Sequence, residues 1–123
     1  MIKQAERASS YYDLEGRTLA FARQVRGFVR KVPQTLGHLE DCKQVVRSSG
    51  SVGANYIEAN ESLGKQDFIM HIKICRKEAK ETCYWLSLLS VEGDELPRVR
   101  DSLVQESGEL MKIFGAILNK CKA

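Results

Sequence analysis

The sequence predicts an all-α protein, an antiparallel up-down-up-down four-helix bundle. Along four segments, apolar residues recur at alternating steps of three and four, the spacing of helix faces that pack together. No segment alternates apolar and polar residues as a strand does. Short connections favour antiparallel neighbours. At 123 residues the chain has the size of one domain. We expect the bundle over residues 13–123, preceded by an N-terminal tail or a short extra turn over residues 1–12.

The first two helices have clear start and stop signals. The first is expected over about Leu14–Val32, with Asp13 placed to cap its start and Pro33 ending it. The second is expected over about Leu36–Ser62, and Gly64 closes that segment. The apolar seam of the first comprises Leu14, Thr18, Phe21, Val25, Phe28 and Val32, and that of the second comprises Leu39, Cys42, Val46, Ser49, Gly53 and Tyr56.

The last two helices are separated by a break at Glu92-Gly93-Asp94. The third is expected over about Gln66–Val91 and the fourth over about Leu96–Lys120, with Pro97 suited to the first turn. The seam of the third comprises Phe68, Ile72, Cys75, Ala79, Thr82, Leu86 and Leu89, and that of the fourth comprises Leu103, Ser107, Leu110, Phe114, Ile117 and Cys121.

A run of small residues interrupts the second helix. Six of the eight residues from Ser48 to Asn55 are Ser, Gly or Ala, and each glycine costs a helix ~1 kcal/mol relative to alanine. One interpretation is a loop between two short helices. The helical spacing continues through the run, which favours close approach of another helix, within the bundle or between subunits. The residues assigned to this role are Ser48, Gly50, Ser51, Gly53, Ala54, Asn55 and Glu58.

Signatures of catalysis, metal binding and membrane insertion are missing from the sequence. His38 and His71 have no partner at metal-ligand spacing, and the four cysteines form no Cys-x-x-Cys pair. We therefore expect no catalytic residues, metal or cofactor, and reduced thiols, three of them at core positions. No apolar run approaches the roughly 20 residues of a membrane-spanning helix, and Met1 to Ser10 are too polar for a secretory signal. A cytoplasmic, non-enzymatic protein is expected.

Two basic rows point to a polyanionic partner. The formal net charge is +3, and basic residues gather on one side of the first and third helices. A solvated face is the alternative for each row alone. Two rows favour RNA, with weak sequence preference because no aromatic stacking platform accompanies them. The candidate nucleic-acid-binding residues are Arg23, Arg26 and Arg30 in the first row, and Lys73, Arg76, Lys77 and Lys80 in the second.

Two motifs resemble those of a known family. The run Arg47-Ser-Ser-Gly-Ser-Val-Gly-Ala-Asn-Tyr-Ile-Glu58, followed by Lys65 and Phe68, is similar to the signature of bacterial four-helix-bundle proteins encoded in 23S ribosomal RNA intervening sequences. The later Glu-x-x-x-Trp-Leu ending of that signature matches Glu81 to Leu86. The resemblance covers about residues 14 to 121. Ala59-Asn60 departs from the Glu-Gly of many members, so the turn there is expected to differ.

The resemblance implies a ring-like homopentamer and kinship with the accessory variability determinant of diversity-generating retroelements. That determinant is a basic pentamer that binds nucleic acid and a reverse transcriptase. For this chain we expect a homo-oligomeric RNA-binding bundle. The alternative is a protein-binding accessory subunit, such as a reverse-transcriptase partner.

Overall fold

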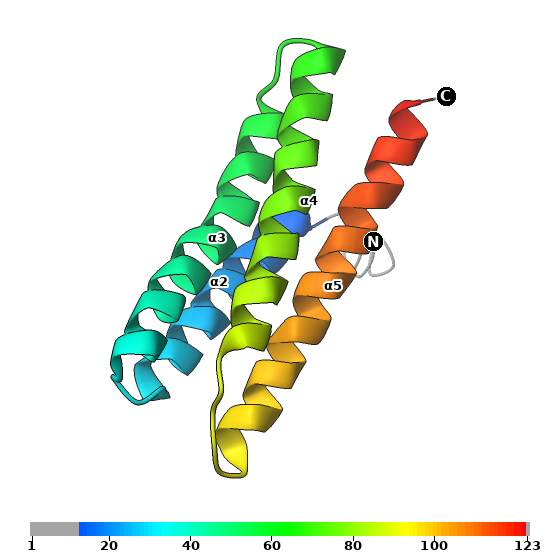
Figure 1. The fold of residues 1–123 in the computed structure, drawn as a ribbon. Helices are drawn as coiled ribbons and strands as arrows, with labels where there is room; N and C mark the ends of the chain where they lie inside the picture. The colour runs from blue at the N-terminus through cyan, green and yellow to red at the C-terminus, as the bar shows by residue number, and fades with distance from the viewer. Residues whose placement is uncertain (1–12, 123) are drawn as a thin grey trace.

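The computed structural model describes residues 13–122, so the tail or extra turn expected over residues 1–12 lies outside it. Over these residues the chain forms four α-helices and no strand, which confirms the all-helical prediction. The helices lie side by side, and each contacts the next along the chain (Figure 1). Their bounds are Leu14–Lys31 for α2, Leu36–Asn60 for α3, Lys65–Leu88 for α4 and Glu95–Cys121 for α5.

Local side-chain and backbone signals place the helix ends. Asp13 caps α2, because its Oδ1 accepts a hydrogen bond from the Gly16 amide at 2.9 Å. Val32 is extended, the backbone that a following proline favours. Thr35 caps α3 by accepting from the His38 amide at 3.2 Å. Gly64 was expected to close the second helix but stands directly before α4, because α3 has already ended at Asn60.

Polar contacts join the two connections at one end of the bundle. The ring of His38 places Nδ1 2.9 Å from the Pro33 carbonyl oxygen and Nε2 3.1 Å from that of Ser90. Arg100 donates from Nη1 to the Leu89 carbonyl at 2.7 Å, which satisfies an acceptor at the end of α4. Gly93 supplies the one positive φ among the described residues, +92°, in the turn before α5.

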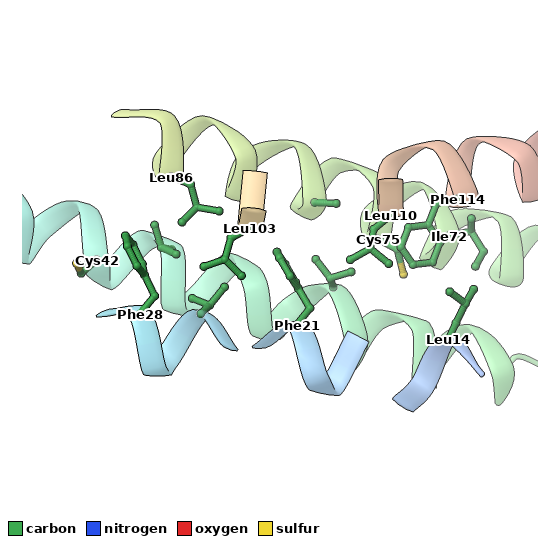
Figure 2. Packing of buried hydrophobic residues seen from close by; sticks show 14 of the residues in the cluster. Leu14, Phe21, Phe28, Cys42, Ile72, Cys75, Leu86, Leu103, Leu110 and Phe114 are labelled. Carbon is green, nitrogen blue, oxygen red and sulfur yellow. The ribbon is translucent and has the colours of Figure 1, made fainter. Parts of the chain in front are cut away.

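Apolar side chains from all four helices meet in one core (Figure 2). Every residue of the seam predicted for the first helix is buried, and the seam of α4 is buried from Ile72 to Leu89. Phe114 and Leu110 of α5 complete the core, while Ile117 and Cys121 near its end are only half-buried. The heptad spacing therefore identified the inward faces of α2 and α4 correctly.

The seam predicted for the second helix was partly wrong. Leu39 is 40% exposed and Val46 is half-buried, whereas the buried side of α3 contains Cys42, Val45, Ser48, Ser49, Val52 and Ala59. The physical reason is that α3 packs against both α2 and α4. A helix with two neighbours buries a wide arc, and no single row of heptad positions describes that arc.

The helices α2 and α5 form the least extensive of the four contacts, and the backbones of α2 and α4 do not lie next to each other. Arg17 joins Glu106 at 2.7 Å, and Lys31 joins Glu95 at 3.0 Å across this pair. A groove of about 560 Å³ lies between them near Lys31. Its apolar lining consists of Phe28, Leu96, Val99 and Leu103.

Among the described residues no helix is long and apolar enough to cross a bilayer.

Candidate nucleic-acid interface

The second basic row lines a groove between α4 and α5. The groove has a volume of about 600 Å³. Positions spaced by three, four and seven residues lie on one side of a helix, so the four basic residues of α4 share the wall. The opposite wall contributes Lys112 from α5. The full lining is Lys73, Arg76, Lys77, Lys80, Gly108, Met111, Lys112 and Gly115.

Two glycines keep this groove open. Gly108 and Gly115 are one heptad apart on α5, and a Cβ built on either would meet no atom within 4 Å. Met111 lies between them along the helix and is half-buried. Few side-chain atoms therefore fill the apolar floor of the groove, while long cationic side chains form its rims. Such a concave basic strip suits a chain of phosphates.

The basic strip continues toward the end of α5. A second hollow of about 380 Å³ shares Lys73 and Arg76 with the groove and adds Lys122. No carboxylate lines either hollow. Within residues 13–122, none of the six basic side chains of the two hollows makes an ion pair: Lys73, Arg76, Lys77, Lys80, Lys112 and Lys122. We call this strip, with its two hollows, the α4/α5 groove.

Other basic side chains are neutralised within the fold. Arg17 holds Glu106 and Glu109, and the hydrogen bond to Glu106 is the main cause that raises the pKa of the Arg17 guanidinium. Arg47 lies between Glu78, at 3.5 Å, and Glu81, at 3.2 Å. Both arginines therefore serve packing between helices, and the α4/α5 groove concentrates cations without such partners.

The first basic row lies on a different side of the protein. Arg23, Arg26 and Arg30 are exposed on α2, whose backbone does not lie next to that of α4. Arg26 folds over α3, because a Cβ built on Gly50 would lie 3.6 Å from its guanidinium. Its Nη1 also donates to the Ala22 carbonyl at 3.4 Å. The structure does not bring the two predicted rows together within one chain.

The small-residue run is continuous helix, so the loop interpretation was wrong. Ser48 is fully buried against α4, where its hydroxyl oxygen lies 2.7 Å from that of Thr82. Gly53 faces α2, and a Cβ there would lie 2.8 Å from Thr18 Oγ1. The run thus lies against α4 on one side and against α2 on the other.

The remaining members of the small-residue set have other surroundings. Asn55 donates from Nδ2 to the Ser51 carbonyl at 2.9 Å and to Ser51 Oγ at 3.0 Å. Its Oδ1 lies 3.4 Å from His71 Nδ1, which links α3 to α4. Ala54 and Glu58 are exposed on α3.

Glu78 is a carboxylate of α4 whose burial the sequence did not predict. Its side chain is 9% exposed and carries the ion pair with Arg47, but its Oε1 makes no hydrogen bond. The position falls on the side of α4 that faces α3, three residues after Cys75 on the seam. Helical spacing could have revealed its burial, although not its partner.

The thiols were predicted correctly in part. Cys42 and Cys75 are buried, but Cys121, expected in the core, is half-buried near the end of α5. All four are free. Burial raises the pKa of Cys75 to about 12, and burial, then the charge of Asp41, raises that of Cys42. Within residues 13–122, no three His, Cys, Asp or Glu side chains gather as a metal site would require.

Sequence reasoning missed the α5 side of the groove. The spacing places neither Lys112 nor Lys122 in a basic row, and it does not show that Gly108 and Gly115 face open space. The spacing of Gly108 and Gly115, one heptad apart and offset from the seam of α5, was the available signal. It marks a face without side-chain bulk, but only the packing of α4 beside it turns that face into a groove.

Comparisons with known proteins agree with the resemblance in the sequence. The pattern of the 23S rRNA-intervening sequence protein family matches residues 15–115. A search of curated proteins finds no match. A crystal structure of a protein of unknown function from the S23 ribosomal protein family of Bacteroides thetaiotaomicron is 30% identical, with a TM-score of 0.75. The similarity covers 85% of this chain and 94% of that one. The chain belongs to the 23S rRNA-intervening sequence protein family.

Proposed function

We propose that this protein is a non-enzymatic, cytoplasmic, homo-oligomeric RNA-binding protein that holds a phosphate backbone in the α4/α5 groove. The observation that carries the proposal is the set of six basic side chains along one hollowed strip without a lining carboxylate. The family description, which names 23S rRNA, supports RNA as the polyanion.

The physical argument is electrostatic. Cations on both walls of a concave strip add their potentials, and a bound phosphate chain releases its condensed counterions. Because the groove offers charge on flexible side chains rather than a fixed array of donors, it distinguishes poorly between sequences. The row on α2, from Arg23 to Arg30, is exposed and separate from the groove, so it contributes less to each contact but repeats around an oligomer.

The proposed assembly is an antiparallel up-down-up-down bundle that forms a homo-oligomer, with a pentamer implied by the family resemblance. The pairings of Lys31 with Glu95 and of Arg17 with Glu106 support opposite directions for α2 and α5. Exposed apolar side chains away from the groove supply surface for contact between copies. They include Leu19, Leu36, Leu39, Ile57 and Leu63.

Binding to fragments of 23S rRNA across a salt series tests the function. We expect log affinity to fall linearly with log salt concentration. Light scattering of the same sample tests the assembly, and a monomer at micromolar concentration would contradict it. A protein that binds neither RNA nor DNA at low salt would show that the groove is only a solvated surface.

A second candidate function is that of a protein-binding subunit, for which the apolar groove between α2 and α5 is the supporting observation. The partner considered is a reverse transcriptase, as the resemblance implies. Val99→Glu places a charge in this groove and should abolish such a complex on size exclusion, whereas Lys77→Glu should leave it intact. Loss of RNA binding in Lys77→Glu but not in Val99→Glu favours RNA binding, the first function.

A further inference from the structure

An exposed aromatic side chain lies at the end of the basic row. Tyr84 is 61% exposed and is the only exposed aromatic residue among residues 13–122. The ring of Trp85 meets it edge-on, with centroids 5.1 Å apart and planes at 79°. A tyrosine so exposed gains little from burial, yet its orientation is supported by a neighbour. An exposed and supported ring is the kind of surface on which a nucleobase stacks.

Helical spacing puts this ring beside the cations of the groove. Tyr84 follows Lys80 by four residues and Lys77 by seven, so the three side chains share one side of α4. One helical turn separates Tyr84 from Lys80, an axial distance of about 6 Å. A lysine side chain and a tyrosine ring can both reach across that distance. The basic row of α4 therefore has an exposed aromatic ring beside it, which its sequence pattern did not predict.

We propose that Tyr84 stacks on an unpaired base while Lys77 and Lys80 hold the adjacent phosphates, so that the groove takes single-stranded RNA. This inference rests on the proposed function and specifies the form of its ligand. In a duplex the bases are stacked on one another and the deep A-form groove excludes side chains. Along a strand, a ring on the protein surface can stack only on bases that are unpaired, since paired bases expose a face only at the end of a duplex.

Charge favours RNA over a second copy of the chain at this face. The side of α4 that presents Tyr84 also presents Lys77 and Lys80 without ion-pair partners among the described residues. Two copies meeting through it would bring like charges together, which opposes association. A phosphate chain has the complementary charge, and its bases supply the apolar surface that the exposed ring lacks.

The single tryptophan provides the test. Trp85 is the only tryptophan of the chain and touches Tyr84, so its fluorescence reports on a base stacked there. The probes are single-stranded oligouridylate, a blunt RNA duplex of equal phosphate number, and inorganic polyphosphate, which has charge but no bases. The wild type should bind all three at low salt, bind oligouridylate tighter than the duplex, and change its fluorescence only with oligouridylate.

The variants separate stacking from charge. Tyr84→Leu should weaken oligouridylate binding about tenfold and leave polyphosphate binding unchanged, whereas Tyr84→Phe should bind as the wild type does. Equal oligouridylate affinity in Tyr84→Leu and wild type overturns the stacking and leaves the groove in place. Absence of binding to any probe by the wild type overturns the proposed function as well. A changed oligomer size of Tyr84→Leu in light scattering assigns this face to contact between copies and overturns the inference.

Discussion

Gly53 of α3 lies so close to Thr18 of α2 that a Cβ on the glycine would come within 2.8 Å of Thr18 Oγ1 and 3.1 Å of Thr18 Cβ. The Thr18 hydroxyl already donates to the Leu14 carbonyl at 2.7 Å and is fully enclosed. It cannot move aside without losing that bond or entering packed core. The glycine therefore sets how closely α2 and α3 approach.

We expect Gly53→Leu to lower the free energy of unfolding by ~1–3 kcal/mol or more, because it overpacks this contact. Urea unfolding followed by circular dichroism measures the loss. Gly50→Ala is the matched control three residues earlier, where the nearest atom, a guanidinium nitrogen of Arg26, is 3.6 Å from the new Cβ. The control should gain up to ~1 kcal/mol through helix propensity. Equal stability of both variants would show that the approach at Gly53 is not tight.

Arg47 neutralises the buried carboxylate of Glu78. Arg47→Met keeps the apolar stem but removes the charge, so it should lower the free energy of unfolding by about 1–3 kcal/mol by leaving that carboxylate unpaired. Adding Glu78→Gln should recover part of the loss. Lys43→Met is the control, since its ion pair with Glu40 is exposed and worth about 0–1 kcal/mol. Thermal melts of the wild type and the three variants decide, and a Lys43→Met loss equal to that of Arg47→Met refutes the argument.

The α4/α5 groove should dominate nucleic-acid binding. Lys73, Lys77 and Lys80 changed together to Gln remove three positive charges, as does the matched set Arg23, Arg26 and Arg30 changed to Gln. Each set takes the formal net charge from +3 to zero. The groove variant should lower the log–log salt slope by about 2 for a single strand, and the α2 variant should lower it less. Circular dichroism and light scattering should show unchanged helix and oligomer size in both. Equal slopes of log affinity against log salt for the two variants would show that the groove does not dominate binding.

Cysteine accessibility provides an independent test of the packing. The sequence predicts that Cys75 and Cys83 both resist alkylation, but Cys83 is half-buried, so its protection should be weaker. In the native protein Cys42 and Cys75 should react slowly with a thiol reagent, and Cys83 and Cys121 faster. Mass spectrometry of partially modified protein gives the order. Rapid modification of Cys75 without unfolding would contradict the core shown in Figure 2.

The raised pKa of Cys75 also predicts a loss of stability in alkali. The thiol ionises near its ordinary pKa of 9.0 in the unfolded chain and near 12 in the folded protein. Between these values the unfolded chain binds fewer protons than the folded protein. The free energy of unfolding is therefore undiminished below pH 9 and falls as the pH rises. The slope is at most about 1.4 kcal/mol per pH unit. Urea unfolding at pH 8 and pH 10 should show a smaller drop for Cys75→Ala than for wild type.

The sequence alone determined which segments become helices, because the signals for that are local. Asp13 caps the start of α2, Pro33 follows its end, and Gly93 makes the turn before α5. The heptad rows of α2 and α4 mark the buried sides of these helices. The helix bounds follow with small shifts, such as the early end of α3 at Asn60. These features depend on contacts within a few residues, which the order of side chains specifies directly.

Only the tertiary structure decided which neighbour each face meets. Periodicity shows that a face is apolar or basic, but not which helix lies beside it. The buried side of α3 is wider than its heptad row because both α2 and α4 pack against it. The basic row of α4 became a groove because Gly108 and Gly115, remote in sequence, lie next to it without side chains. The row on α2 stayed apart, since packing did not place the backbones of α2 and α4 next to each other.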